Sequence, residues 1–461
     1  MAEFFNQFES LLKTAFTGGI DAQTLSFRRL QQKNLSRKEV KRFYAGCHRG
    51  YDKAQNKIVE MLAGLESDTS LAEEEKLYRE SLLRKIMDGI AATCLGDRIH
   101  LMRRLVIHTD APHINLKVVR ETLLAANKLN EESRMTFAVV ADLTSFIHIA
   151  DILRIDFRDG PPKISFTELK TGKVNKILLD KLEEYEPKPE DLARLRRDET
   201  IDPRHVKQVE RMLRQQIRLA QVDQIMRTDV GADLQLNKKV LWSREETKLP
   251  SYAEFLDRMC SAAVGKGVAA GTLAHCLHFG VGYAEGEADS KRNARRGVNC
   301  AIHYSRASQP DGMAKIIEET AEFVPSNQMF TFTDNYRSNL AATAVRPFVH
   351  WELKKEHIHA LARRKLVILM AFDLGGFIWL CRHVIGMDTE FGTRREAAEL
   401  AAEFGANTMV TWGGRALSVR TRNGSSTLFG GILSRFANDL SNPIAFLNGV
   451  MNSQFPRPSQ D

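Results

Sequence analysis

Apolar residues recur at helical spacing through most of the first 105 residues. Ser36 followed by Glu39 is typical of a capping box that opens a helix. The charged segment 73–84 continues the same pattern without any grouping of catalytic side chains. The spacing predicts a helical N-terminal region over residues 1–105.

The pattern changes after residue 105. A helical repeat over 116–129 is followed by β-like runs over 136–141, 146–157 and 163–170, with Asp-Gly-Pro-Pro as the turn between the last two. A second helix begins near residue 202. The segment 106–245 is therefore predicted as a helix, three strands with a tight connection, and a helix.

The remaining residues, 246–461, are expected to form a separate α+β domain of unassigned role. Strands are predicted within 271–282 and 300–304, a helix over 391–404, and a basic loop around 291–296. The apolar stretch 366–381 is too short to cross a bilayer and contains Asp373, so two buried strands joined by a turn are predicted there. No membrane partner is expected.

Length and charge narrow the class of protein. A chain of 461 residues predicts two or three domains, and a net charge of +8 favours a polyanion such as nucleic acid. The six cysteines are scattered, which indicates buried thiols in a reducing compartment and no zinc knuckle. No signal peptide is indicated, so a cytoplasmic location is expected.

Candidate chemistry gathers at the second and third predicted strands. Side chains alternate along a strand, so Glu168 and Lys170 share a face, and pairing of the strands can bring Asp151 beside Glu168. Two carboxylates can then hold a divalent metal, with the Lys170 ammonium beside the attacking water or the phosphate.

Glu-x-Lys is itself a common pattern. It occurs six times in this chain, and an exposed salt bridge is the ordinary explanation for most copies. Only Glu168 follows a β-like hairpin with an aspartate near its start. Glu352, with Asp334 upstream, is the nearest rival, although the segment between them does not read as a hairpin.

The run Asp151…Glu168-Leu169-Lys170-Thr171-Gly172-Lys173 resembles the core of the PD-(D/E)XK nuclease superfamily, although Ala150 stands where that family often has Pro or Gly. The resemblance covers about 120–225. It implies an α/β, restriction-endonuclease-like core, a mixed sheet flanked by helices, in which Asp151 and Glu168 bind Mg²⁺ (or Mn²⁺) and Lys170 assists attack on phosphate. Glu121 on the preceding helix is a further candidate ligand, although a surface charge is the commoner explanation.

The helix after these strands has two distinct faces. Val206, Val209, Leu213, Ile217 and Ala220 share an apolar face. A basic stripe lies opposite and is made of Lys207, Arg211, Arg214 and Arg218. Such stripes are often only solvated surface, but this one is a candidate for phosphate contact. The family resemblance implies that Gln208 helps to orient the site; Met212 stands where that subgroup has an aromatic residue.

The sequence thus predicts a Mg²⁺-dependent nuclease, with DNA favoured over RNA as substrate. The alternative is a nuclease-like protein that has lost catalysis and only binds nucleic acid or serves as a scaffold. A protein partner or homo-oligomer is an open expectation, and gating by the C-terminal domain in an antiviral (anti-phage) defence system is the biological setting that the resemblance suggests.

Overall fold

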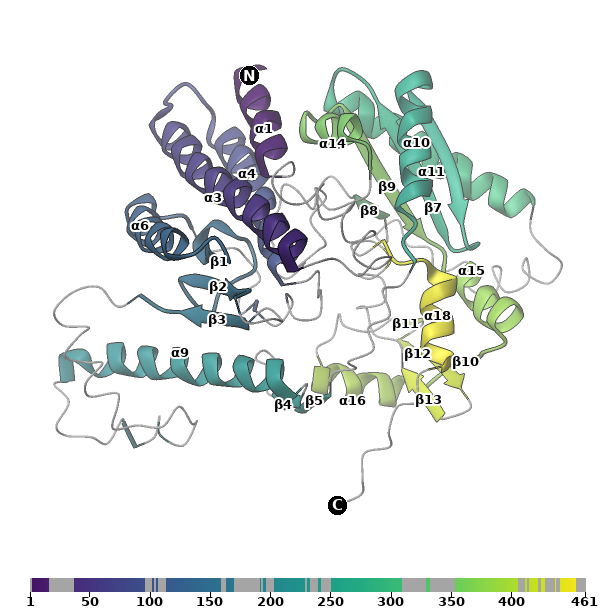
Figure 1. Cartoon of the computed structure of the whole chain (residues 1–461). Helices are drawn as coiled ribbons and strands as arrows, with labels where there is room; N and C mark the ends of the chain where they lie inside the picture. Colours follow the sequence, from purple (N-terminus) through teal and green to yellow (C-terminus); the bar gives the residue numbers. More distant parts are fainter. Residues whose placement is uncertain are drawn as a thin grey trace. The chain divides into compact units, whose positions relative to one another are not determined.

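The structure is a computed structural model that forms two compact units, one ending at Leu241 and the other starting at Pro250 among the residues it describes. The residues described are 2–15, 37–95, 102, 105–106, 113–158, 163–169, 191, 194–195, 203–228, 230–232, 239–241, 250–308, 329–331, 353–404, 411–412, 414–421, 424–427, 436 and 440–452. Figure 1 shows their helices and strands. The mixed helix and strand content agrees with the predicted combination of α and β structure.

The N-terminal part of the first unit is helical, as predicted. It contains α1 (Ala2–Ala15), α3 (Arg37–Ser67) and α4 (Glu73–Cys94). Helix α4 is buried around most of its circumference from Tyr78 onward, charged residues included. The expected division at residue 105 lies inside this unit, because α3 packs directly on α6 (Leu116–Glu132) and on the first strand.

A three-stranded antiparallel sheet follows α6, in the order β1 (Thr136–Val140), β2 (Ile152–Asp156) and β3 (Lys163–Thr167). Helix α6 packs on β1. The predicted order of a helix, three strands and a helix is confirmed. The described strands of this sheet pair antiparallel, whereas the resemblance implied a mixed sheet. The short 3₁₀ helix η2 (Ala141–Leu143) follows β1. The second strand begins later than predicted, because the backbone at 147 and 148 is bonded to Thr144 Oγ1 and to Leu105 O and not to a neighbouring strand.

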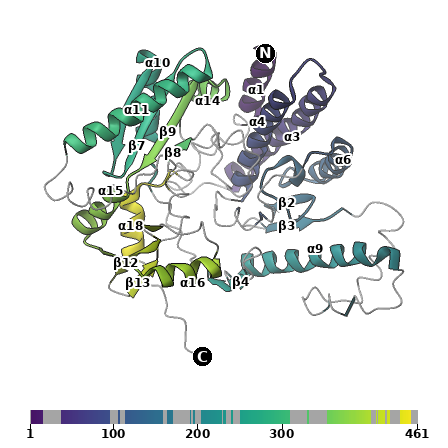
Figure 2. The ribbon, with the colours of Figure 1, turned by 180° about the vertical axis from the view of Figure 1, so that it is seen from behind.

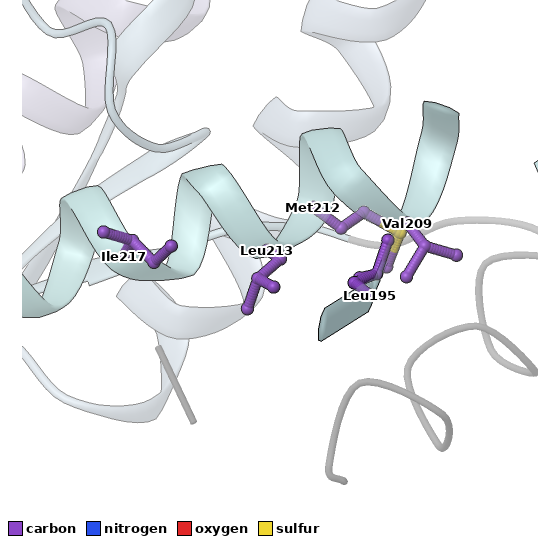
Figure 3. Packing of buried hydrophobic residues seen from close by; sticks show 5 residues of the cluster. All are labelled: Leu195, Val209, Met212, Leu213 and Ile217. Carbon is purple, nitrogen blue, oxygen red and sulfur yellow. The ribbon is translucent and has the colours of Figure 1, made fainter. Parts of the chain in front are cut away.

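Helix α9 (Pro203–Thr228) completes the predicted order and contacts β4 (Val230–Ala232), which pairs with β5 (Lys239–Leu241). Its predicted apolar face is confirmed, since Val209 and Leu213 are fully buried and Ile217 nearly so. Met212 joins this cluster, and Leu195 packs on it from outside the helix (Figure 3).

The second unit is built on a four-stranded antiparallel sheet in the order β6-β7-β9-β8. Its strands are β6 (Val268–Leu273), β7 (Leu277–Tyr283), β8 (Met329–Thr331) and β9 (Leu366–Phe372). Helix α10 (Ala253–Lys266) packs on the face of Gly271 and Phe279, and α11 (Glu287–Ala307) packs on the face of Gly280 and Gly282. The sheet is thus covered on both faces.

The rest of the second unit comprises smaller elements. The helices are α14 (Lys355–Ala362), α15 (Leu374–Trp379), the π-helical turn η6 (Leu380–Ile385), α16 (Arg394–Phe404) and α18 (Pro443–Asn452). Strand β12 (Arg415–Thr421) pairs antiparallel with β10 (Asp388–Phe391), β11 (Thr411–Trp412) and β13 (Gly424–Thr427). The helix predicted over 391–404 is confirmed from Arg394.

Three sequence predictions for this unit are wrong. The strand predicted over 300–304 and the basic loop predicted around 291–296 are both parts of α11. Only the first half of 366–381 is a strand. Asp373 accepts a hydrogen bond from Gly376 N at 3.0 Å and so begins α15 where a second strand was expected.

The start of α15 requires a glycine at position 376. A Cβ added there would come within 2.0 Å of His275 O, so the helix can approach the β6–β7 turn only without a side chain at that position.

Among the described helices none is long and apolar enough to cross a membrane. All six cysteines are free thiols, and Cys300 alone is exposed, in contrast to the expectation that all are buried.

Candidate functional site

The candidate site lies at one end of the β2–β3 pair. The register of the two strands ends with Ile152 opposite Thr167, so Asp151 and Glu168 both leave the sheet at this end. Asp151 N donates to Thr167 O at 3.1 Å, and Leu169 N donates to the Asp151 carboxylate at 2.5 Å. The Asp151 side chain is thereby fixed against the backbone that directly follows Glu168.

Asp151 and Glu168 were predicted to lie within strands, and each lies one residue outside. Asp151 O still accepts a hydrogen bond from Ala141 N at 2.8 Å, but its carboxylate takes the Leu169 N–H in place of a further backbone partner. Both residues are half-buried. Lys170, the third predicted catalytic residue, lies outside the described residues.

Asp142 is a carboxylate at this site that the sequence prediction missed. It belongs to η2, next to the Ala141–Asp151 hydrogen bond, and it is half-buried. Burial raises the pKa of the Asp142 carboxyl; Arg84 lowers it again, and the negative charge of Glu168 adds to the rise. Asp142 and Glu168 are therefore electrostatic neighbours although 26 positions separate them. Nothing in the sequence indicated this role, because an aspartate just after a short β run is common and usually lies in a turn.

The backbone before Asp151 is held by buried charges of α4. Arg84, with 1% of its side chain exposed, donates through Nη1 to Asp142 O at 3.2 Å and to Thr144 O at 2.9 Å, and its Nε contacts Glu80 at 3.0 Å. Asp88 accepts hydrogen bonds from Ser145 N and Ser145 Oγ, each at 2.6 Å. These bonds fix residues 142–145, which lead into Asp151. They were not predicted, because arginine and aspartate in a charged helical segment usually face solvent.

The donor atoms at the site suit a hard divalent cation. Mg²⁺ in proteins is commonly held by one or two carboxylates and completes its shell with water and phosphate oxygens. Asp151 and Glu168 supply such carboxylates at one end of the sheet. Within the part of the chain that the structure describes, no group of three or more His, Cys, Asp or Glu side chains forms a metal site. The fit therefore rests on two carboxylates.

Three other polar residues of the first unit were possible members of the site, and two of them have local partners. Asp156, at the opposite end of β2, is paired with Arg158 at 2.5 Å, and this hydrogen bond lowers the pKa of Asp156 to about 2. Glu121 is exposed on α6. His148 Nε2 lies 3.1 Å from Ser145 O.

The basic side of α9 is only partly described. Lys207 and Arg214 are exposed, and Gln208 and Arg218 are half-buried; the side chain of Arg211 lies outside the described residues. Arg214 is paired with Glu210 at 2.5 Å. Burial, with a contribution from Arg214, lowers the pKa of Arg218.

The rival site at Glu352 lies outside the described residues, as does Asp334. The lysine of that motif, Lys354, lies 3.3 Å from Ser261 Oγ and 3.9 Å from Asp257.

The comparisons with known proteins add no relative: no protein-family model, curated protein or solved structure matches this chain.

Proposed function

We propose that the first unit is a Mg²⁺-dependent nuclease that hydrolyses phosphodiester bonds, with DNA as the favoured substrate. The observation that carries the proposal is the hydrogen bond from Leu169 N to the Asp151 carboxylate, which fixes Asp151 against the backbone that directly follows Glu168. The order of a helix, three antiparallel strands and a helix around this hydrogen bond supports it.

Each residue has a distinct role in this proposal. Asp151 and Glu168 hold the cation through carboxylate oxygens, and Lys170 orients the attacking water or stabilises the charge that develops on the phosphate. A bound Mg²⁺ neutralises phosphate charge and makes the attacking water more acidic. Asp142 adds negative charge beside Glu168, which strengthens attraction for a cation. Arg84 and Asp88 hold the loop that carries Asp151.

The basic side of α9 is the proposed contact for the phosphate backbone. Lys207 and Arg214 are exposed, and their contacts would be electrostatic, so binding through them should weaken steeply as salt increases. Gln208 is proposed to help orient the site.

Cleavage of plasmid and linear DNA by the purified full chain, with Mg²⁺ and with a chelator, tests the proposal. Mg²⁺-dependent nicking that is lost in Glu168→Gln and in Lys170→Met, while both variants still bind DNA, is the expected result. A parent chain that binds DNA but never cleaves it would instead support the alternative, a nuclease-like binding protein. Equal cleavage by the parent and both variants would place the activity elsewhere.

A further inference from the structure

The basic segment expected as a loop lies in the first half of α11, a helix that packs closely on its sheet. Its inner face is made of small residues, Ser290, Ala294, Gly297, Val298 and Ala301, all buried. A Cβ added at Gly280 of β7 would lie 2.0 Å from Ala294 O. Figure 2 shows α11 lying along β7 and β9. The large side chains of its outer face therefore take no part in holding the helix to the sheet.

The outer face of α11 carries polar and basic side chains on one stripe. With about 100° between successive residues, Arg292, Arg296, Asn299 and His303 fall within an arc of about 60° and extend over about 16 Å. All four are exposed, and Arg295 flanks the stripe. Tyr304, which is 70% exposed, lies beside His303 with 6.1 Å between ring centroids. A fixed helix thus presents arginine, asparagine and aromatic side chains to solvent.

Charge on this face is unbalanced. Arg292 is paired with Asp289 at 3.0 Å, and Lys291 with Glu287 at 3.4 Å. For Arg295 and Arg296, by contrast, no ion pair or hydrogen bond is found with any residue that the structure describes. Arg295 and Arg296 are consecutive residues, about 100° apart around the helix, and Arg296 lies one turn beyond Arg292 on the stripe. Guanidinium groups spaced in this way along an exposed helix face suit a ligand with several negative charges.

We propose that this outer face of α11, from Arg292 to Tyr304, binds duplex nucleic acid through its phosphate backbone. Arginine contacts phosphate bidentately, and asparagine is a common partner of phosphates and base edges. The surface belongs to the second unit, whereas Asp151 and Glu168 belong to the first, so binding here does not depend on cleavage by the first unit. A role of the second unit in retaining substrate rests on the proposed nuclease function of the first unit.

The test measures binding of a fluorescent 20-base-pair duplex by anisotropy, from low to moderate salt. The full chain carries Glu168→Gln in every sample, so cleavage does not affect the readout. A triple variant, Arg292→Gln with Arg295→Gln and Arg296→Gln, is compared with a control that removes the same charge elsewhere in the unit: Arg258→Gln, Lys266→Gln and Arg395→Gln, all exposed.

The α11 triple variant should bind at least about tenfold more weakly at low salt. Each lost phosphate contact should reduce the slope of log K against log salt by about 0.9. The control triple should remain within about twofold of the parent, and replacing the three α11 arginines with lysine should restore most of the affinity. Circular dichroism checks that each variant is folded. The same measurement is repeated with a single-stranded 20-base probe. Equal affinity of the α11 triple and the parent, an equal loss in both triples, or binding of the parent to the single-stranded probe alone would overturn the proposal.

Discussion

Asp151 accepts a hydrogen bond from the backbone N–H of Leu169 at 2.5 Å, across the end of the β2–β3 pair. The same carboxylate is a proposed metal ligand, so this side chain has both a structural and a chemical role. An uncharged acceptor can keep the hydrogen bond but supplies a much weaker ligand for Mg²⁺. The two roles can therefore be separated by substitution.

Asp151→Asn should unfold at nearly the same urea concentration as the parent, because its amide oxygen can still accept from Leu169 N. Asp151→Ala should lose about 1–3 kcal/mol of stability, since the half-buried N–H loses its acceptor. Urea denaturation followed by circular dichroism measures both. If the two variants are equally stable, the hydrogen bond does not hold the end of the hairpin.

Arg84→Met should destabilise the first unit by about 3–5 kcal/mol. The substitution removes the buried guanidinium that binds Asp142 O and Thr144 O, and it leaves Glu80 without its partner. The matched control is Lys57→Met on α3, whose exposed pair with Glu60 should contribute less than about 1 kcal/mol. Denaturant unfolding provides the comparison, and similar losses in the two variants would contradict the role given to Arg84.

Gly280→Ala should destabilise the second unit, because the new methyl would meet backbone atoms of α11: Ala294 O at 2.0 Å and Val298 N at 2.4 Å. Backbone cannot move aside as a flexible side chain can, so a loss of at least about 2 kcal/mol is expected. Gly265→Ala on α10 is the control. Nothing lies within 4 Å of its added Cβ, so it should be neutral or stabilise by up to about 1 kcal/mol. A melting temperature of Gly280→Ala at or above that of the parent would show that α11 is not pressed against β7.

Arg158→Met should raise the pKa of Asp156 from about 2 toward the ordinary value of 3.8. A carboxyl whose pKa is lower in the folded state stabilises the fold above pH 4, and this contribution is lost as the pH falls from about 4 to about 2. The variant should therefore lose less stability over that pH interval than the parent does. Carboxyl titration by NMR measures the pKa, with Arg258→Met in the second unit as the control. An unchanged pKa in Arg158→Met would rule out the pairing.

Local patterns predicted the elements whose burial follows one simple period. The apolar face of α9 was visible because Val209, Leu213 and Ile217 recur at helical spacing. The end of the hairpin was visible because Asp151 and Glu168 flank two β-rich runs. The point at which the second strand begins could not be predicted. The segment before it is held at Ser145 by Asp88, which lies 57 positions earlier in the chain. The roles of Arg84 and Asp142 were equally hidden, because a buried charge looks like a surface charge until its partners are known.

The most direct test of the metal-dependent site compares the two aspartates at opposite ends of β2. Asp151→Asn and Asp156→Asn make the same chemical change, but only Asp151 adjoins the Glu168 segment, while Asp156 is paired with Arg158. The rate of DNA cleavage with Mg²⁺ should fall by at least about a thousandfold in Asp151→Asn and stay within about twofold of the parent in Asp156→Asn. Cleavage by Asp151→Asn at the parent rate, with both variants folded, would contradict the account.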